Sequence, residues 1–477
     1  MDNKNTKKTF INQSVISLLK LLHFLVIVVL FSISWFWFRY NGLPDFAKIG
    51  FRYNYFVIIG YGVLVLFFYR TYNGYLLGYS CFKTLVFAQG MAQFFSLVIM
   101  YFSVSIGWSR FRNPLPLICV FFIQLICDTI WSCLANRLFF RLNPPKSAVL
   151  IFRNTVDRNR IGTIEERTVG RLFRIEKEIM HDGDFSEIRD QLENYDAIFV
   201  TGVNSRCRNG ILKYCQENNI PGFYLPHVGD VIMQQAVHIQ AFDTPIMYVN
   251  RAAQGIGYAI AKRGFDIIAS LVGLIISSPI LIITAVCIRL YDRGPAIYKQ
   301  VRLTKDGKKF KIWKFRSMRV DAEKDGVARL SSGEKDDRIT PIGRFIRKCR
   351  LDELPQLWNI FRGDMSIVGP RPERPEIAEK YCQTMPEFML RLQVKAGLTG
   401  YAQVYGKYNT DPYEKLEFDL MYIKDMSVLT DLRLMFATAA ILCQSKSTEG
   451  IAAGQTTAMD NENSKEHPEG EGKSSVR

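Results

Sequence analysis

The sequence predicts a membrane protein with an α-helical amino-terminal bundle of four transmembrane helices, a Rossmann-like α/β domain, and a mixed α/β, mostly helical domain that begins at a further apolar segment. Three observations lead to this fold class. Four apolar segments fill the first 140 residues, strand and helix patterns follow from residue 145, and an apolar stretch at 264–290 leads into a strongly basic region. We expect domains at 1–141, 145–250 and 260–445 and a disordered tail at 446–477.

The four amino-terminal apolar segments are candidates to cross a membrane. They lie at Val15–Phe38, Tyr55–Tyr69, Leu85–Trp108 and Leu115–Phe140. A helix needs about 20 residues to span the hydrocarbon core, so the second segment is short, and we expect Tyr53 and Tyr69 to anchor it at the interfaces. Basic residues before the first segment and after Arg137 place both ends of this domain in the cytoplasm. No cleavage site of small residues follows the first segment, so we expect a retained helix.

Charge and cysteine content narrow the class of function. The formal net charge of +16, in a chain with several membrane segments, favours anionic lipids and phosphorylated substrates as partners and not nucleic acid. The sequence has no zinc-finger, RNP or helix-turn-helix pattern. Its ten cysteines form no CxxC pair and its five histidines form no HExxH motif. We therefore expect reduced, buried thiols, and neither a disulfide framework nor a zinc site.

Residues 145 to about 245 have the pattern of a Rossmann-like α/β domain. The stretches Ala148–Phe152, Tyr195–Thr201 and Gly222–Leu225 are typical of buried parallel strands, and Asn209–Glu217 is typical of a helix between strands. After the first strand comes Arg153–Asp157, where a dinucleotide-binding turn needs glycines so that the backbone can approach a pyrophosphate. We therefore expect a structural or regulatory domain and not a cofactor site.

The apolar segment Gly264–Leu290 sets the membrane topology of the two domains that flank it. Proline removes one helical hydrogen bond and clashes with the preceding turn, so Ser278-Pro279 is predicted to split the segment into halves of about 14 and 11 residues. Neither half crosses a bilayer of about 30 Å alone. The residues leave two topologies open. A kinked helix that crosses would put the flanking domains on opposite sides of the membrane, whereas a re-entrant hairpin would keep both in the cytoplasm.

The paired carboxylates Asp352 and Glu353, in the stretch Leu351–Leu357, are the main candidates for chemistry. Adjacent residues of a helix point about 100° apart, so the two side chains can take separate roles around one site. One could attack phosphorus while the other binds a metal or handles a proton. An acidic first turn with Pro355 nearby is also typical of an ordinary helix start.

A strongly basic region precedes this pair, with 18 Lys or Arg and 8 Asp or Glu between residues 291 and 350. Lys314 and Arg316 lie in an alternating stretch at 310–319, and Arg371 lies in the rigid turn Gly369–Glu373. An anionic nucleophile near a diphosphate is repelled by about 4 kcal/mol per charge pair at 4 Å with an effective dielectric near 20. Cations and Mg²⁺ must offset this repulsion, and we expect them also to lower the pKa of Asp352.

Ordered motifs over about 180 residues resemble one family. They are KRGFDI at Lys262–Ile267, Ser278-Pro279, GPAIYKQVR at Gly294–Arg302, KFRSM at Lys314–Met318, LDELPQLWNIFRGDMSIVGPRPE at Leu351–Glu373 and GLTGYAQ at Gly397–Gln403. This part of the chain resembles the catalytic domain of the bacterial polyprenyl-phosphate phosphoglycosyl transferases with a re-entrant hairpin. With the amino-terminal helices and the α/β domain, the chain resembles the long form of that family, which starts exopolysaccharide, capsule or O-antigen synthesis.

The resemblance implies transfer of a sugar-1-phosphate from a UDP-sugar to undecaprenyl phosphate, with release of UMP and with Mg²⁺ bridging the diphosphate. It implies that Asp352 is the nucleophile of a phosphosugar-aspartyl intermediate and Glu353 its partner, both also candidate magnesium ligands. The implied phosphate or nucleotide contacts are Lys314, Arg316, Arg371, Pro372 and Lys407. The implied residues on the side of the hairpin and the acceptor are Ser278, Pro279, Gln300 and Arg302.

The resemblance also favours the re-entrant hairpin, a place in the bacterial inner membrane among its lipids with the catalytic domain facing the cytoplasm, and a homodimer as one arrangement. The chain departs from the family pattern at Ala396, where proline is usual, and at Lys407, where arginine with its bidentate fork is favoured. Two other functions remain open: a non-catalytic membrane scaffold or regulator of polysaccharide assembly, and a sugar-nucleotide oxidoreductase or epimerase. The intact carboxylate pair argues against the first, and the missing glycines against the second. UDP-glucose is a common donor in the long form, but no motif identifies the sugar.

Overall fold

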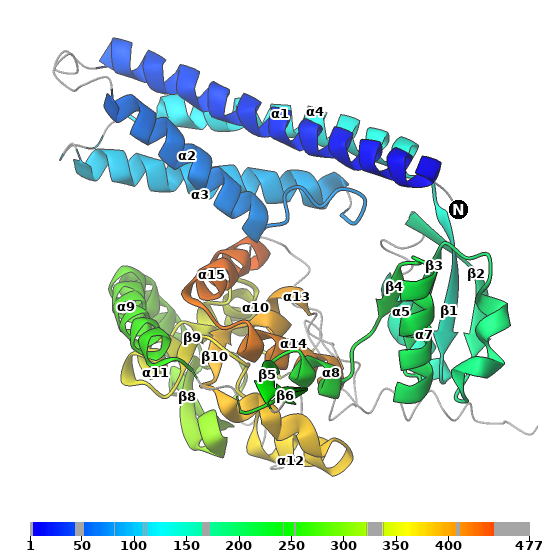
Figure 1. The fold of residues 1–477 in the computed structure, drawn as a ribbon. Coiled ribbons are helices and arrows are strands. Elements are labelled where there is room, and N and C mark those ends of the chain that lie inside the picture. Colours follow the sequence, from blue (N-terminus) through cyan, green and yellow to red (C-terminus); the bar gives the residue numbers. More distant parts are fainter. Residues whose placement is uncertain are drawn as a thin grey trace, which may run out of the picture. The chain divides into compact units, whose positions relative to one another are not determined.

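The computed structural model describes residues 3–42, 52–80, 82–107, 109, 111, 113–164, 172–241, 243–251, 254–320, 322, 336, 338–406 and 411–442. Lys407 and the predicted disordered tail at 446–477 lie outside these residues. The chain divides into two compact units, Met1–Leu225 and Pro226–Arg477 (Figure 1). Residues 226–250, grouped with the α/β domain from the sequence, belong to the second unit.

The first unit begins with four long helices at the predicted apolar segments. They are α1 (Asn3–Gly42), α2 (Arg52–Thr71), α3 (Phe82–Gly107) and α4 (Leu115–Leu142). Each is long and apolar enough to cross a membrane, as is α9 (Ile256–Asp292) of the second unit, which makes five such helices within the described residues. The short second segment gains residues at both ends to form a helix of 20 residues, the length that a crossing needs.

Buried polar side chains join these four helices to one another. His23 of α1 and Gln93 of α3 both contact Asp128 Oδ1 of α4, at 3.1 and 2.9 Å. Gln93 also donates to the hydroxyl of Tyr69 of α2 at 3.0 Å. Polar groups inside an apolar helix pack need partners, so this network, which includes a residue from each helix, fixes how the helices are rotated against one another.

A parallel sheet of four strands follows in the first unit, with the strand order β2-β1-β3-β4. The strands are β1 (Lys146–Phe152), β2 (Phe173–Met180), β3 (Ala197–Thr201) and β4 (Gly222–Tyr224). Val149 and Ile151 face a core shared with α7 (Ser205–Glu217), and Ala148 and Leu150 face the opposite core. Two-sided burial explains the near-continuous apolar runs in β1 and β3, and the predicted strands and helix are confirmed.

The turn after β1 is closed by side chains. Asn154 Oδ1 accepts a hydrogen bond from the backbone N–H of Asp157 at 2.8 Å, at the start of α5 (Thr155–Ile164). Asp157 also places a carboxylate in the first turn of this helix. A capped and acidic helix start does not complement a pyrophosphate, in contrast to a glycine-rich turn that leaves its N–H groups open.

The second unit is mixed α/β with short strands, as predicted. Before the carboxylate pair its elements are α8 (Val228–Met233), the exposed hairpin β5 (Val237–Ala241) and β6 (Thr244–Tyr248), α9, the antiparallel pair β7 (Ile297–Leu303) and β8 (Lys309–Phe315) joined by η5 (Lys305–Gly307), and α10 (Pro341–Lys348). After α10 come η7 (Leu351–Glu353), α11 (Gln356–Arg362), β9 (Ser366–Val368), α12 (Pro375–Thr384), η8 (Pro386–Gln393), β10 (Gly397–Thr399), α13 (Tyr401–Tyr405), α14 (Pro412–Lys424) and α15 (Val428–Leu442). Their shared core includes the fully buried Phe388, Leu416 and Leu420.

Helix α9 continues through Pro279. The prediction that the Ser-Pro pair splits the segment into two separate helical halves is therefore wrong. Pro279 has no N–H for the carbonyl of Ile275, four residues earlier. The Ser278 hydroxyl donates to that carbonyl at 2.8 Å and takes the place of the missing donor. The Ser-Pro pair therefore weakens the helix locally while leaving it hydrogen-bonded.

Both ends of α9 are attached to the second unit. Near the amino end, Lys262 Nζ forms an ion pair with Asp431 Oδ2 at 2.7 Å, and buried Asp266 accepts from the N–H of Ile367 at 3.0 Å. Near the carboxyl end, Asp292 forms an ion pair with Arg316. Between these attachments α9 exposes large apolar side chains: Ile275, Ile276, Ile280, Ile282 and Ile283.

Candidate functional site

The carboxylate pair lies in a single 3₁₀ turn, η7, which is entered through a strained residue. Arg350 has φ 56° and ψ 19°, in the left-handed region that costs a non-glycine residue about 1–2 kcal/mol. A 3₁₀ helix has three residues per turn, so the Asp352 and Glu353 side chains diverge by about 120° and not by the 100° of an α-helix. The two side chains thus leave the turn in different directions, and the separate roles expected for them stay a prediction.

Glu353 is the charged centre of the site. Its Oε1 accepts from Arg371 Nη2 at 2.6 Å and lies 3.4 Å from Lys314 Nζ. Its Oε2 lies 3.9 Å from Arg350 Nη1. Burial acts to raise the pKa of Glu353, but the cations, Arg371 first among them, outweigh burial and hold that pKa well below its ordinary range. Glu353 is therefore ionised throughout the physiological range.

Asp352 has the opposite environment. Its Oδ1 is buried and has no hydrogen-bond partner within the described part of the chain. Burial and the neighbouring charge of Glu353 raise the pKa of Asp352 to about 6, against the opposing effect of Lys314. The cations do lower the pKa of Asp352, as expected, but the expected net decrease is wrong, because burial and the adjacent negative charge outweigh them. At neutral pH this carboxylate is still mostly ionised, with one oxygen unengaged.

Arg371 reaches Glu353 from the loop Gly369–Glu373, which follows β9. Strand β9 pairs in parallel with β10, and the N–H of Gly369 donates to Thr399 O at 2.8 Å. A Cβ on Gly397 would overlap the backbone of Gly369, so the two segments approach each other more closely than any side chain allows. The glycine of the GLTGYAQ motif thus serves to pack backbone on backbone beside the Arg371 loop.

Gln300, Arg302 and Pro372 form one connected group. Arg302 Nη2 donates to Gln300 Oε1 at 2.7 Å, and Arg302 Nη1 donates to Pro372 O at 3.1 Å. The predicted acceptor-side residues Gln300 and Arg302 therefore lie against the loop that carries Arg371. Burial lowers the pKa of the Arg302 guanidinium, which the nearby Glu373 partly opposes.

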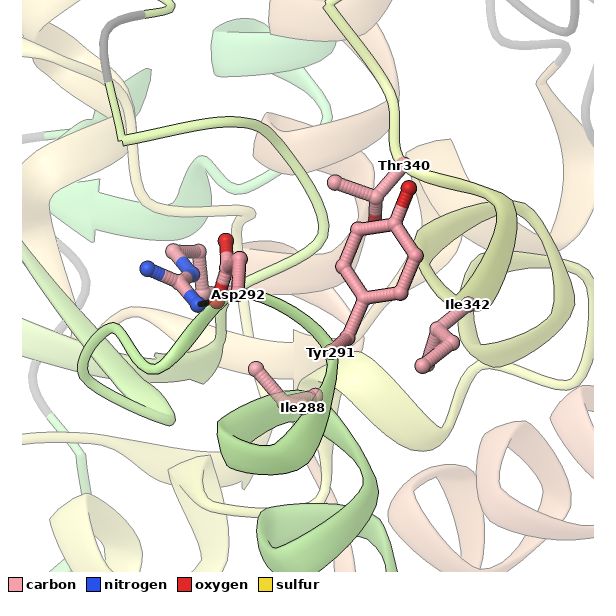
Figure 2. Close-up of a pocket in the computed structure, with 6 residues that line it drawn as sticks. Ile288, Tyr291, Asp292, Thr340 and Ile342 are labelled. Carbon is pink, nitrogen blue, oxygen red and sulfur yellow. Dashed lines mark hydrogen bonds and ion pairs between the residues drawn. The ribbon is translucent and has the colours of Figure 1, made fainter.

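Arg316 lies in a different place from Lys314. Its guanidinium is buried in an ion pair with Asp292, at the carboxyl end of α9. Figure 2 shows the adjoining pocket, in which the Tyr291 ring lies in front of Thr340 and Asp292 lies to the left of both. The structure thus gives Arg316 a structural partner on α9, and its predicted contact with phosphate stays a prediction.

The remaining predicted residues divide between α9 and the undescribed part of the chain. Ser278 and Pro279 lie in the exposed apolar middle of α9. Lys407 lies outside the described residues, so its predicted phosphate contact stays a prediction. At Ala396 the departure from proline has a local use: its N–H donates to Thr304 Oγ1 at 3.2 Å, a bond that proline could not form.

Comparison with known proteins identifies the second unit. The family model described as bacterial sugar transferase matches residues 257–445. The UDP-glucose:undecaprenyl-phosphate glucose-1-phosphate transferase of Caulobacter vibrioides is 37% identical over 188 residues, which cover 38% of this chain and 70% of that relative. This chain belongs to the bacterial sugar transferase family. The predicted resemblance is thereby confirmed.

Two further relatives of this bacterial sugar transferase show the spread of sugars in the family. The UDP-glucose:undecaprenyl-phosphate glucose-1-phosphate transferase of Escherichia coli K12 is 42% identical over 205 residues, 42% of each chain. The UDP-N-acetylgalactosamine-undecaprenyl-phosphate N-acetylgalactosaminephosphotransferase of Aeromonas hydrophila is 40% identical over 184 residues, 38% of this chain and 43% of that relative. The match thus spans less than half the length of either relative.

Sequence reasoning missed two functional candidates of this bacterial sugar transferase. Arg391 and Asp419 form an ion pair at 2.7 Å and are 2% and 1% exposed. The signal that could have found Asp419 is its place at a core position of α14, between Leu416 and Leu420. A carboxylate at such a position needs a buried cation, and Arg391, 28 residues earlier, supplies it.

The residues of the site fit a magnesium ion held mainly by substrate. Mg²⁺ takes oxygen ligands and is commonly held by one or two carboxylates together with substrate phosphates. Asp352 Oδ1 is a buried oxygen that fits one such ligand, whereas Glu353 Oε1 already accepts from Arg371. Within the described ranges no group of three His, Cys, Asp or Glu side chains could enclose a metal, so a cage made only of these protein ligands is not formed there.

Proposed function

We propose that this bacterial sugar transferase moves a sugar-1-phosphate from a UDP-sugar to undecaprenyl phosphate, the first membrane step in the synthesis of an exopolysaccharide, capsule or O-antigen. The observation that supports this most directly is the state of Asp352. Its buried Oδ1 is unengaged, while the adjacent Glu353 is held by Arg371 and Lys314. A free anionic oxygen beside fixed cations is what attack on a phosphate diester needs.

The proposed reaction has two displacements at one phosphorus. Asp352 Oδ1 attacks the phosphorus that bears the sugar, an Asp–phosphorus bond forms, and the phosphoanhydride bond breaks so that UMP leaves with the electron pair. A phosphate oxygen of undecaprenyl phosphate then attacks the same phosphorus, and the aspartate carboxylate leaves. One phosphoanhydride is lost and one is formed, so the exchange is close to thermoneutral, and the two-step order predicts ping-pong kinetics.

The cations of the site stabilise charge that develops during these steps. Lys314 and Arg371 already bind Glu353, so they stand where a diphosphate would meet the carboxylates. Bound Mg²⁺ would neutralise diphosphate charge, with the carboxylates of Asp352 and Glu353 as its candidate protein ligands. Glu353 would keep both cations aimed at the substrate and hold Asp352 in its high-pKa state.

The membrane arrangement belongs to the same proposal. We propose that α1–α4 form a transmembrane bundle, that the parallel sheet is a Rossmann-like cytosolic domain, and that α9 enters the membrane and returns. The two attachments of α9, through Lys262 and through Asp292, both reach the domain that carries Asp352. A helix attached at both ends to one water-exposed domain supports a re-entrant course over a crossing one.

The deciding experiment is a panel of UDP-sugars with undecaprenyl phosphate and Mg²⁺, read out as UMP release by the full-length enzyme in detergent or nanodiscs. Asp352→Asn is expected to abolish both UMP release and the trapped phosphosugar-enzyme. Asp306→Asn is the matched control, because Asp306 is exposed and its positive φ suits asparagine. Release of UMP from no sugar in the panel would favour the non-catalytic scaffold instead, and activity of Asp352→Asn would remove Asp352 as nucleophile.

Topology is tested by single cysteines at residues 250 and 300 in a cysteine-free background, labelled from each side of the membrane. Labelling of both positions from the cytoplasmic side is expected for a re-entrant α9. Labelling from opposite sides would show that α9 crosses the membrane.

A further inference from the structure

Two buried arginines donate hydrogen bonds to backbone carbonyls of the loop that carries Arg371. Arg391 Nη2 donates to Arg371 O at 3.0 Å, and Arg302 Nη1 donates to Pro372 O at 3.1 Å. The two arginines come from different elements, η8 and β7, so the loop is fixed from two directions. The Arg371 side chain itself is directed to the carboxylate pair, because it donates to Glu353 at 2.6 Å.

Glu373 completes this arrangement. Its backbone O accepts from the N–H of Leu303 at 3.0 Å, so three successive carbonyls of the loop have donors. Its carboxylate lies 3.9 Å from Arg302 Nη1 and 3.8 Å from Arg391 Nη1. The negative charge between the two guanidinium groups lets both stay buried close to each other.

Asp419 fixes the orientation of Arg391. Its Oδ2 accepts from Arg391 Nε at 2.8 Å and lies 2.7 Å from Nη2, and the guanidinium lies over the Phe388 ring at 4.8 Å from the centroid. A planar guanidinium held by a carboxylate and an aromatic face has one orientation left. That orientation directs Nη2 to the Arg371 carbonyl.

A buried ion pair adds little net stability, because desolvation of the charges offsets their attraction, and well-packed apolar residues often serve as well. The pair Arg391–Asp419 therefore calls for a reason beyond holding the fold together. Among the described residues, the pair contacts the Arg371 loop through the hydrogen bond to the Arg371 carbonyl and through the ion pair of Arg391 with Glu373.

We propose that Arg391 and Asp419 are positioning residues for the sugar-phosphate transfer, which act through the backbone of Arg371 to set its guanidinium against Glu353 and the incoming diphosphate. This inference rests on the proposed function. Misplacement of a positioned group by about 1 Å can cost a reaction about a hundredfold. Loss of the pair should therefore lower the rate of the enzyme that remains folded, in addition to any loss of stability.

The test is a double-mutant cycle on the full-length enzyme, with Asp419→Asn made in the wild type and in Arg371→Lys, and kcat/KM measured by UMP release per folded enzyme. If Asp419 acts through Arg371, Asp419→Asn lowers kcat/KM by about tenfold to a hundredfold in the wild type and by less than about twofold in Arg371→Lys. Equal losses in both backgrounds, or no loss in the wild type, would overturn the proposal.

Two further variants keep the result interpretable. Asp336→Asn removes a matched buried carboxylate, whose Oδ1 and Oδ2 accept from Arg338 Nε and Nη2 at 2.8 and 2.7 Å, and it is expected to lower the melting temperature without changing kcat/KM more than about twofold. Arg391→Lys keeps the charge but not the fork, so it should fold and lose activity like Asp419→Asn. Full activity of Arg391→Lys would overturn the proposal that Arg391 positions Arg371. Absence of UMP release from the wild type would instead refute the proposed function.

Discussion

Replacing Glu353 with glutamine should move the titration of its neighbour Asp352. Glu353 contributes a fixed negative charge that raises the pKa of Asp352, second only to burial. Glutamine removes that charge at nearly constant volume. It also frees Arg371 and Lys314 from their present ion pairs, so both cations act more fully on Asp352. Both changes stabilise ionised Asp352, and its pKa must fall.

The size of the effect follows from the charges. The pKa of Asp352 is raised from 3.8 to about 6, which disfavours its ionised form by about 3 kcal/mol, since one pKa unit is about 1.4 kcal/mol. Two like charges about 5 Å apart at an effective dielectric of 20 repel by about 3 kcal/mol. Asp352 remains buried in the variant, and this burial keeps part of the increase in its pKa. We therefore expect the pKa of Asp352 in Glu353→Gln to fall by at least about one unit, to about 5 or below.

The assay is the pH dependence of kcat/KM for the UDP-sugar, which reports groups of the free enzyme. In the proposed mechanism Asp352 attacks only when ionised, so activity should be present above its pKa and lost as the pH falls through it. The wild type should lose activity with a midpoint near pH 6. Glu353→Gln should be much less active at every pH, but its residual activity should persist to lower pH than that of the wild type.

Glu376→Gln is the matched control, because Glu376 is an exposed carboxylate on α12 that pairs with Arg374. Its activity and its midpoint near pH 6 should match the wild type. If the midpoint of the pH dependence in Glu353→Gln stays at about 6 or rises, the charge of Glu353 does not raise the pKa of Asp352 and the reasoning is refuted.

Three further substitutions test the frame around the site. Arg263→Ala removes two 2.8 Å hydrogen bonds to the carbonyls of Ile360 and Phe361 at the end of α11. It should lower the free energy of unfolding by about 2–4 kcal/mol in thermal or denaturant unfolding. An unchanged stability would show that those bonds are dispensable. Gly397→Ala should reduce the yield of folded enzyme, because its Cβ would overlap Gly369. Gly257→Ala, where a Cβ meets open space, should fold normally. Equal yields of folded enzyme from the two variants would contradict the close packing. Ser278→Ala leaves the Ile275 carbonyl without its 2.8 Å donor and should lower the melting temperature in nanodiscs by a few degrees, an effect that Ser278→Thr should largely spare.

The sequence predicts most elements of the fold where one pattern dominates. The apolar runs at α1–α4 and in β1 and β3 are long or continuous, so burial alone identifies them. Strand β2 was not predicted, because four of the eight residues of FRIEKEIM are charged and Lys177 interrupts the alternation of apolar and charged residues. The 3₁₀ turn at Asp352 was likewise not visible, because it depends on the left-handed Arg350.

The site was predicted less completely than the fold. The motifs identify Asp352, Glu353, Lys314 and Arg371, and the structure brings these four together. The ion pair of Arg316 could not be predicted from the alternating pattern, because its partner Asp292 lies at the end of α9, 24 residues earlier. Arg391 and Asp419 were missed for the same reason: a pair formed across tertiary structure leaves no local pattern.

The double attachment of α9 makes its length a fixed dimension of the enzyme. An α-helix rises about 1.5 Å and turns about 100° per residue, so inserting one residue between Lys262 and Asp292 rotates one attachment away from its partner, and inserting four displaces it by about 6 Å. A helix tethered at one end could absorb such a change by sliding deeper into the lipid. On the proposed re-entrant course, α9 could not drift in the lipid independently of the domain that holds both of its ends, and bilayers of different thickness would act directly on the domain that carries Asp352.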